Sequence, residues 1–206
     1  EYDPIMNTWL SKTIMPTPRW KLTSAVVDGK LYTVGGGSTG NTCIPTGIVQ
    51  QYDPATDMWF TKKSMSTPRW GHASVVVNGK IYVFGGNSAC PIIASSSLEI
   101  YDPLIDTWSS GTSMSTARWD LTAAEANGKI YAIGGWDANN NVPLQTVEEY
   151  NPITNTWTPK SSMLTARTGL TAQLLNGKIY VFGGFDGAKV VNIIEIYDPI
   201  TDTWLP

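Results

Sequence analysis

The sequence is poor in cysteine, in charge of one sign and in long apolar runs, and each shortage excludes a class of protein. Its 206 residues include two cysteines, Cys43 and Cys90, which are too few for a disulfide scaffold and lack metal-binding or redox spacing. The longest apolar runs, such as 81–84, have the length of a strand and cannot span a bilayer. The formal net charge is −3 and no basic stripe is present, which argues against nucleic acid as a partner. The composition therefore predicts a soluble globular protein.

The start of the chain shows neither a signal peptide nor a transit peptide. Because Glu1 is not an initiator methionine and the chain opens inside a repeated unit, we expect a processed or excised piece of a longer protein. The compartment stays open. If the protein is secreted, Cys43 and Cys90 could form a disulfide between neighbouring repeats, and otherwise they are two ordinary loop thiols.

One pattern recurs along the whole chain. Tyrosines at positions 2, 52, 101, 150 and 197 follow one another at intervals of 50, 49, 49 and 47 residues, and tryptophans at 9, 59, 108, 157 and 204 keep the same intervals. Each full unit also contains a methionine, an arginine, an Asn-Gly or Asp-Gly pair and a Gly-Gly pair, as in 65–86. We predict one repeat domain over 1–206, with units of about 2–51, 52–100, 101–149 and 150–196 and a partial unit at 197–206.

Each unit is typical of four antiparallel strands, here named a to d. The runs "HASVVV" and "KIYVFGG" flank Asn78-Gly79, a pair suited to a tight hairpin, and predict strands a and b. Strand c is the alternating run "SLEIY", and strand d follows a turn at Asp102-Pro103. No stretch keeps a helical period. One such sheet cannot bury both faces, so copies must stack, and four-stranded units of this size favour a β-propeller over a solenoid.

The Gly pair after "IYVF", the "YDPATDMW" segment and the "MSTPR" lead-in resemble kelch repeats over essentially the whole chain. The resemblance implies an all-β kelch β-propeller in which each repeat is one blade, with strand a beside the channel and strand d outermost. Four a–b hairpins and five c–d segments are present, so the chain holds four full four-stranded repeats and an extra c–d half repeat. Three arrangements stay open: a piece of a larger propeller, a closed ring of four blades completed by one end segment, and pairing between chains through open sheet edges.

The connections between strands differ on the two faces of such a propeller. The a–b and c–d turns are nearly identical in all repeats, so the face that carries them is architectural. The opposite face carries the linkers from strand d to the next strand a, and the b–c loops at 37–47, 87–96, 136–145 and 185–192. These loops vary in length and chemistry, which is typical of binding positions on a rigid frame. We call this side the linker-and-loop face.

Each linker ends in an arginine, and three of the four arginines precede a tryptophan. The residues are Arg19, Arg69, Arg118 and Arg167, followed by Trp20, Trp70, Trp119 and Thr168. Four guanidinium groups around one opening predict a positive patch on an acidic protein. The alternative is an architectural role, in which the arginines bond backbone carbonyls and the tryptophans pack between blades.

The linkers are also similar to those of kelch substrate adaptors of ubiquitin ligases. In those adaptors, arginines at the matching linker position contact acidic peptides, together with side chains directly after the Gly pair. The resemblance implies the same role for the matching positions of this chain. The matching positions after the Gly pair are Gly37, Asn87, Trp136 and Phe185, of which only the last two are aromatic. No BTB or BACK segment is present, so the expectation covers the binding face and not the adaptor role.

Catalysis has little support in the sequence. His72 is the only histidine, so the two-histidine copper site of the radical oxidases that resemble this architecture cannot form from these residues. No nucleophile elbow or phosphate-cradling glycine loop is present. Bacterial sialic acid mutarotases also resemble kelch propellers, and for such a sugar acid Arg69, Arg118, Asp120 and His72 are the candidate carboxylate clamp and proton shuttles.

The sequence therefore predicts a non-catalytic binding or scaffold module for a protein or acidic peptide, without metal or cofactor. The predicted ligand-binding residues are Arg19, Arg69, Arg118, Arg167, Trp20, Trp70, Trp119, Trp136, Phe185, His72 and Asp120. On this hypothesis Arg118→Ala weakens binding without loss of fold. The alternatives are sugar binding, mutarotase-like activity and a purely structural segment of a larger protein.

Overall fold

The computed structural model describes residues 1–38 and 44–206, which form strands, turns and loops. Its main units are four antiparallel sheets of four strands each, which we call blades 1 to 4. Blade 1 consists of β4 (Thr23–Val27), β5 (Lys30–Val34), β7 (Val49–Asp53) and β8 (Met58–Lys62). Blade 2 consists of β9 (Ala73–Val77), β10 (Lys80–Phe84), β11 (Leu98–Asp102) and β12 (Thr107–Gly111). Blade 3 consists of β13 (Thr122–Ala126), β14 (Lys129–Ile133), β17 (Val147–Asn151) and β18 (Thr156–Lys160). Blade 4 consists of β19 (Thr171–Leu175), β20 (Lys178–Phe182), β21 (Ile194–Asp198) and β22 (Thr203–Leu205).

Short strands add smaller sheets to these blades. They pair as β1 (Tyr2–Asp3) with β2 (Thr8–Trp9), β3 (Arg19–Trp20) with β6 (Gly37–Ser38), and β15 (Trp136–Asp137) with β16 (Val142–Pro143). No membrane-crossing helix occurs in the described part of the chain.

The hairpins form for the reason that the sequence indicates. Asn78 and Gly79 have φ angles of 49° and 72° and join β9 to β10, with Val77 paired to Lys80. Positive φ at both turn residues is the type I′ geometry, whose twist matches that of the flanking strands. The same Asn-Gly or Asp-Gly geometry recurs in the other three blades, so all four a–b hairpins keep one register.

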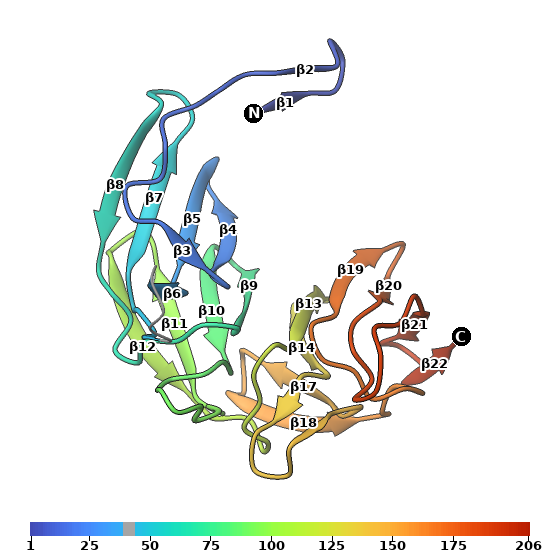
Figure 1. The fold of residues 1–206 in the computed structure, drawn as a ribbon. Helices are drawn as coiled ribbons and strands as arrows, with labels where there is room; N and C mark the ends of the chain where they lie inside the picture. The colour runs from blue at the N-terminus through green and yellow to red at the C-terminus, as the bar shows by residue number, and fades with distance from the viewer. Residues whose placement is uncertain (39–43) are drawn as a thin grey trace.

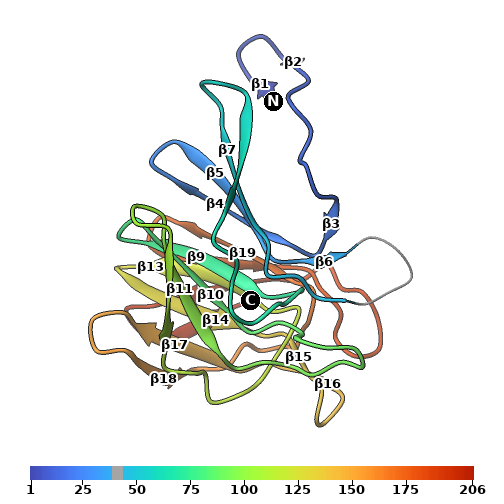
Figure 2. The same ribbon diagram turned by 90° about the vertical axis from the view of Figure 1, so that its left-hand side faces the viewer.

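The blades fan around an open space with their first strands innermost. Figure 1 shows β4, β9, β13 and β19 at the inner rim, and successive members of this set contact one another. Figure 2 shows the short strands β3, β6, β15 and β16 gathered toward one side of the molecule. These strands belong to the linkers and the b–c loops, so both lie on a common face as predicted.

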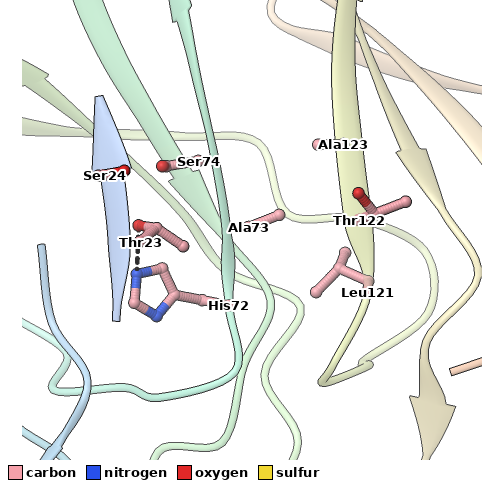
Figure 3. Close-up of a pocket in the computed structure, with 8 residues that line it drawn as sticks. All are labelled: Thr23, Ser24, His72, Ala73, Ser74, Leu121, Thr122 and Ala123. Atoms are coloured by element: carbon pink, nitrogen blue, oxygen red, sulfur yellow. Dashed lines mark hydrogen bonds between the residues drawn. The ribbon is translucent and has the colours of Figure 1, made fainter. Parts of the chain in front are cut away.

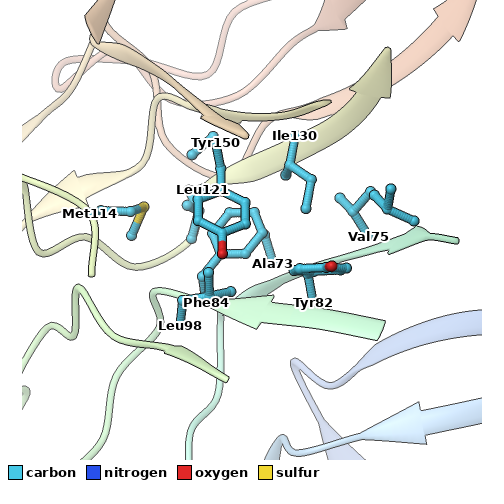
Figure 4. Packing of buried hydrophobic residues seen from close by; sticks show 11 residues of the cluster. Ala73, Val75, Tyr82, Phe84, Leu98, Met114, Leu121, Ile130 and Tyr150 are labelled. Carbon is cyan, nitrogen blue, oxygen red and sulfur yellow. The ribbon is translucent and has the colours of Figure 1, made fainter. Parts of the chain in front are cut away.

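Apolar side chains from facing sheets hold neighbouring blades together. Burying one large apolar side chain, such as leucine, isoleucine or phenylalanine, stabilises the fold by about 1.5–3 kcal/mol. The cluster between blades 2 and 3 includes Tyr82, Phe84, Leu98, Leu121, Ile130 and Tyr150 (Figure 4). The strand-d tryptophans add a bond between blades, since Trp108 Nε1 donates to the Lys63 carbonyl at 2.8 Å, and Trp59, Trp157 and Trp204 repeat this bond. These tryptophans are architectural.

The two ends of the fan do not meet. Among the described residues, β1 and β2 pair only with each other, and β22 completes blade 4 by pairing with β21. The expectation of a closed four-blade ring is therefore wrong for this structure, because neither end segment completes the blade begun by the other (Figure 1). Apolar side chains of the two end blades are exposed, such as Val26 of blade 1 at 62% and Leu175 of blade 4 at 55%.

Candidate functional site

The linkers and b–c loops meet through short antiparallel bridges on the linker-and-loop face. Each bridge joins the residue after a linker arginine to the residue after a Gly pair. The four pairs are Trp20 with Gly37, Trp70 with Asn87, Trp119 with Trp136 and Thr168 with Phe185. The structure thus brings together the linker and loop positions that the sequence matched to a binding face.

The four arginines turn away from this face and into their own blades. The side chains of Arg69, Arg118 and Arg167 are fully buried, with 0% exposure, and Arg19 is 9% exposed. In blade 2, Arg69 Nη1 donates to the carbonyls of Gly85 and Ser97 at 2.8 and 3.1 Å, and Nη2 donates to Glu99 Oε1 at 2.8 Å. The guanidinium therefore ties the linker to strands b and c of the same blade.

A glutamate on strand c completes this arrangement, which we call the Arg–Glu clasp. The clasps are Arg69–Glu99, Arg118–Glu148 and Arg167–Glu195. Glu99 also accepts hydrogen bonds from the backbone amides of Ser66 and Thr67 in the linker. Burial raises the pKa of Glu99, but the hydrogen bonds from Ser66 and the charge of Arg69 outweigh burial, so its pKa lies below the ordinary value.

Blade 1 departs from the clasp because Gln50 stands where the other blades have glutamate. Arg19 Nη2 donates to Gln50 Oε1 at 2.9 Å and to Thr33 Oγ1 at 2.7 Å, and Nη1 donates to the carbonyls of Gly35 and Ile48. Burial lowers the pKa of Arg19. Its guanidinium is bound as closely to its own blade as the other three.

Over residues 1–38 and 44–206, the linker-and-loop face therefore lacks the predicted patch of four guanidinium groups. Every arginine of the chain is one of these four, and their charged groups bond carbonyls, carboxylates and amides within the blades. The expectation that Arg19, Arg69, Arg118 and Arg167 contact a ligand is corrected by this burial. The arginines have the architectural role, because one guanidinium group carries five N–H donors and can bond several carbonyl oxygens at once.

The tryptophans after the arginines gather into a cluster where three linkers converge. Trp20 and Trp70 have ring centroids 4.9 Å apart, and Trp70 and Trp119 have centroids 5.2 Å apart at an interplanar angle of 78°. Trp20 is 38% exposed, whereas Trp70 is buried. Further along the face, Trp136 and Phe185 stack with centroids 6.5 Å apart. The predicted aromatic positions thus form a cluster of three indoles and a stacked pair, which the backbone bridge between Trp119 and Trp136 connects.

The residues that follow Trp20, Trp70, Trp119 and Thr168 form an open series of backbone hydrogen bonds, which we call the collar. Its members are Lys21, Gly71, Asp120 and Gly169, all with positive φ angles between 49° and 62°. The amide of each later member donates to the carbonyl of the one before it, at 3.0, 2.7 and 2.9 Å. A Cβ on Gly71 would lie 2.5 Å from Asp120 Oδ1, so glycine leaves room for the Asp120 side chain to cross it.

Across Gly71, the Lys21 ammonium forms an ion pair with Asp120. The Lys21 Nζ atom also lies 5.0 Å from the Trp70 ring centroid and 4.8 Å from that of Trp119. Burial raises the pKa of Asp120, with the hydrogen bond and charge of Lys21 acting in the opposite direction. The collar therefore presents a charged pair among indole rings.

Below the collar, the inner strands line a cavity of about 230 Å³. Small and hydroxyl-bearing side chains surround it, including Ser24, Ser74 and Thr122, with His72 at its wall (Figure 3). His72 Nε2 lies 2.9 Å from Thr23 Oγ1. Burial, and secondarily the charge of Arg69, lowers the pKa of His72 to about 3, so the ring is neutral near neutral pH.

This geometry removes the carboxylate clamp expected for a sugar acid. Arg69 and Arg118 are buried in their clasps and do not reach the cavity, and His72 does not titrate near neutral pH. Asp120 is itself part of the collar, where it is paired with Lys21. No group of three potential metal ligands occurs in residues 1–38 and 44–206. The predicted pairing of Cys43 with Cys90 lies outside the described residues, because Cys43 is not among them.

Comparison with known proteins places the repeat in a family. The kelch motif matches residues 68–115, 120–164 and 166–206, which together make up more than half of the chain. The chain belongs to the kelch family. The solved structure of YjhT is similar to this kelch chain with a TM-score of 0.77 and 19% identity, over 92% of this chain and 71% of that chain. This likeness confirms the all-β propeller fold. No curated protein matches the chain.

Lys21 is the residue of this kelch face that sequence reasoning missed. A signal was present, because Lys21, Gly71, Asp120 and Gly169 recur at intervals of 50, 49 and 49 residues. The glycines Gly71 and Gly169 in this series indicate that the position has a positive φ. The remaining positions hold Lys21 and Asp120, whose opposite charges indicate an ion pair.

Proposed function

We propose that this protein is a non-catalytic binding module whose linker-and-loop face takes a segment of a partner protein or a peptide. The observation that carries the proposal is the tryptophan cluster of Trp20, Trp70 and Trp119, next to the stacked pair of Trp136 and Phe185. Large aromatic side chains supply much of the energy of protein interfaces, because they bury a large apolar area at a small cost in side-chain entropy.

The contrast between the two faces supports this choice. The opposite face repeats the same a–b and c–d turns, and its exposed apolar side chains lie on separate turn tips, such as Leu104 at 90% and Ile153 at 93% exposure. Single exposed apolar residues are ordinary, whereas a cluster of aromatic rings indicates an interaction surface. In the described part of the chain, the linker-and-loop face combines clustered aromatic rings with loops that vary between repeats.

The preference for acidic ligands does not carry over into the proposal. It depended on four exposed guanidinium groups, and those groups are buried in the blades. Recognition then depends on aromatic contact and on the loops.

A peptide selection tests this function. Random peptides displayed on phage are selected on the wild-type protein, and the affinity of the best peptides is measured by fluorescence polarisation. Trp20→Ala and Trp136→Ala are expected to weaken binding at least about tenfold, which corresponds to about 1.4 kcal/mol. Ile153→Ala on the opposite face is the matched control and leaves the affinity unchanged.

The outcome can also go against the proposal. Peptides whose affinity falls with Ile153→Ala but not with Trp20→Ala or Trp136→Ala would place binding on the other face. A selection that yields no binder to the folded protein would remove the function itself.

A further inference from the structure

The pair of Lys21 and Asp120 points to what the tryptophan cluster binds, an inference that rests on the proposed function. The Lys21 ammonium lies over the faces of two indoles, with Nζ 5.0 Å from the Trp70 centroid and 4.8 Å from the Trp119 centroid. Asp120 supplies a carboxylate to the same ammonium. Two indole faces and one carboxylate around a single point are all attractive to a cation.

The fold does not need these side chains at the collar. Gly71 and Gly169 take the same positive φ angles, 60° and 62°, and the collar hydrogen bonds use main-chain atoms in all repeats. Glycine is the residue that adopts this backbone without strain, whereas lysine rarely does. Lys21, at a φ of 49°, therefore occupies a strained position that glycine fills in two other repeats. A strained residue that the backbone does not require indicates that the side chain has a role.

The pair is also accessible and open to exchange. The side chains of Lys21 and Asp120 are 39% and 18% exposed, so solvent reaches the pair and partly screens its attraction. A cavity of about 220 Å³ adjoins them, lined by collar residues together with Leu22, Leu121 and Leu170. An incoming group can reach the Lys21–Asp120 pair from this cavity.

We propose that Trp70, Trp119 and Asp120 form a seat for a cationic group, that Lys21 is its internal occupant, and that a basic side chain of the ligand displaces Lys21. The seat suits a lysine or arginine side chain, because its hydrocarbon stem packs on apolar surface such as Trp20 while the charged head meets the indoles and the carboxylate. A carboxylate of the ligand would be repelled there, because the faces of the two indoles and the side chain of Asp120 are all negative.

Chemical rescue of a lysine deletion tests the seat. Lys21→Ala removes three methylene groups and the ammonium, which n-propylammonium matches in shape and charge. We expect n-propylammonium to raise the thermal midpoint of Lys21→Ala at concentrations about tenfold below those that act on the wild type. In the same titration the indole Nε1–H resonances of Trp70 and Trp119 shift, because the cation returns to their rings.

Matched controls separate the seat from a general salt effect. Lys80→Ala removes an exposed lysine that pairs with Asp102 at 2.8 Å, away from the tryptophan cluster, and n-propylammonium should not act on it selectively. Lys21→Met fills the seat with an uncharged side chain and should show no rescue, and 1-propanol and propionate should not replace the cation.

Two results would overturn the seat. Equal effects of n-propylammonium on Lys21→Ala and Lys80→Ala would show that the Lys21 position has no specific affinity for a cation. Rescue by propionate would show that the site prefers an anion. Either result leaves the peptide selection with Trp20→Ala and Trp136→Ala unaffected, so failure of the seat and failure of the proposed function are distinguishable.

Discussion

The protein contains two kinds of ion pair that differ in where they lie and in what they do. In the clasps, the arginine is fully buried and its glutamate nearly so, as in Arg118 and Glu148 at 0% and 3% side-chain exposure. In the collar, Lys21 and Asp120 are 39% and 18% exposed. A buried pair becomes a fixed part of the frame, because separating it leaves a charge without solvent or partner. A pair that solvent reaches is weaker and can exchange its partner, which is what a binding site requires.

The sharpest way to break this comparison is to open one clasp. Arg118→Ala leaves Glu148 buried without its counter-charge, and we expect the free energy of unfolding to fall by about 3–5 kcal/mol. Urea denaturation followed by circular dichroism measures the loss. This result differs from the prediction from sequence, in which Arg118→Ala weakened binding and left the fold intact.

Removing both partners of the clasp is the matched control. Replacing Arg118 with Met together with Glu148 with Leu leaves no unpaired buried charge, so part of the stability should return. A loss below about 1 kcal/mol for Arg118→Ala alone would contradict the architectural role, since that is the range of exposed pairs.

Among the described residues, the buried His72 has no acidic partner, so the cost of burying a charge can be measured through the pH dependence of stability. The pKa of His72 is lowered to about 3 by burial and by Arg69, while an unfolded histidine has a pKa of about 6.5. Between these values the unfolded chain binds a proton that the folded protein does not, so stability falls as the pH falls. From about pH 7.5 to about pH 5 we expect a loss of about 2 kcal/mol.

Urea denaturation at both pH values, compared between wild type and His72→Gln, checks this expectation. His72 is the only histidine, and aspartates and glutamates titrate mainly below this range. The variant should therefore lose the pH dependence, and an equal fall in both proteins would assign it to other groups.

The smallest expected effect belongs to the exposed pair. Lys21→Ala should lower the free energy of unfolding by less than about 1 kcal/mol, because solvent already screens the pair. Lys80→Ala, at a comparable surface pair, gives the reference value in the same urea titration. A loss of stability for Lys21→Ala as large as that for Arg118→Ala would show that the collar pair stabilises the fold as the clasps do.

Most of the fold could be predicted from the sequence, because its signals are local. The Asn78-Gly79 turn and the alternation in 73–84 determine a hairpin whatever the neighbouring blade does, and the structure confirms both. How the ends meet depends on packing between distant segments, so three arrangements stayed open. The β1–β2 hairpin is the first of the five predicted c–d segments, and only its separation from the four blades needed the structure.

The site was harder to predict, because the direction of a side chain depends on a distant partner. The sequence placed Arg69 correctly in a linker, but Glu99, 30 residues later, turns its guanidinium inward. The glutamates in "SLEIY", "TVEEY" and "IIEIY" were a usable signal, since they follow their arginines at nearly constant spacing. Alternation along strand c puts each glutamate on one face but does not tell whether solvent or a linker covers that face.

Chemical modification of arginine tests most directly whether the guanidinium groups belong to the frame or to the binding face. The folded protein is treated with phenylglyoxal, and each arginine is followed by peptide mass spectrometry against the same reaction in urea. Arg69, Arg118 and Arg167 should stay unmodified in the folded protein and react once it is unfolded, with Arg19 reacting slowly at 9% exposure. Rapid modification of those three arginines in the folded protein would contradict the account and restore the charged ring as the recognition surface.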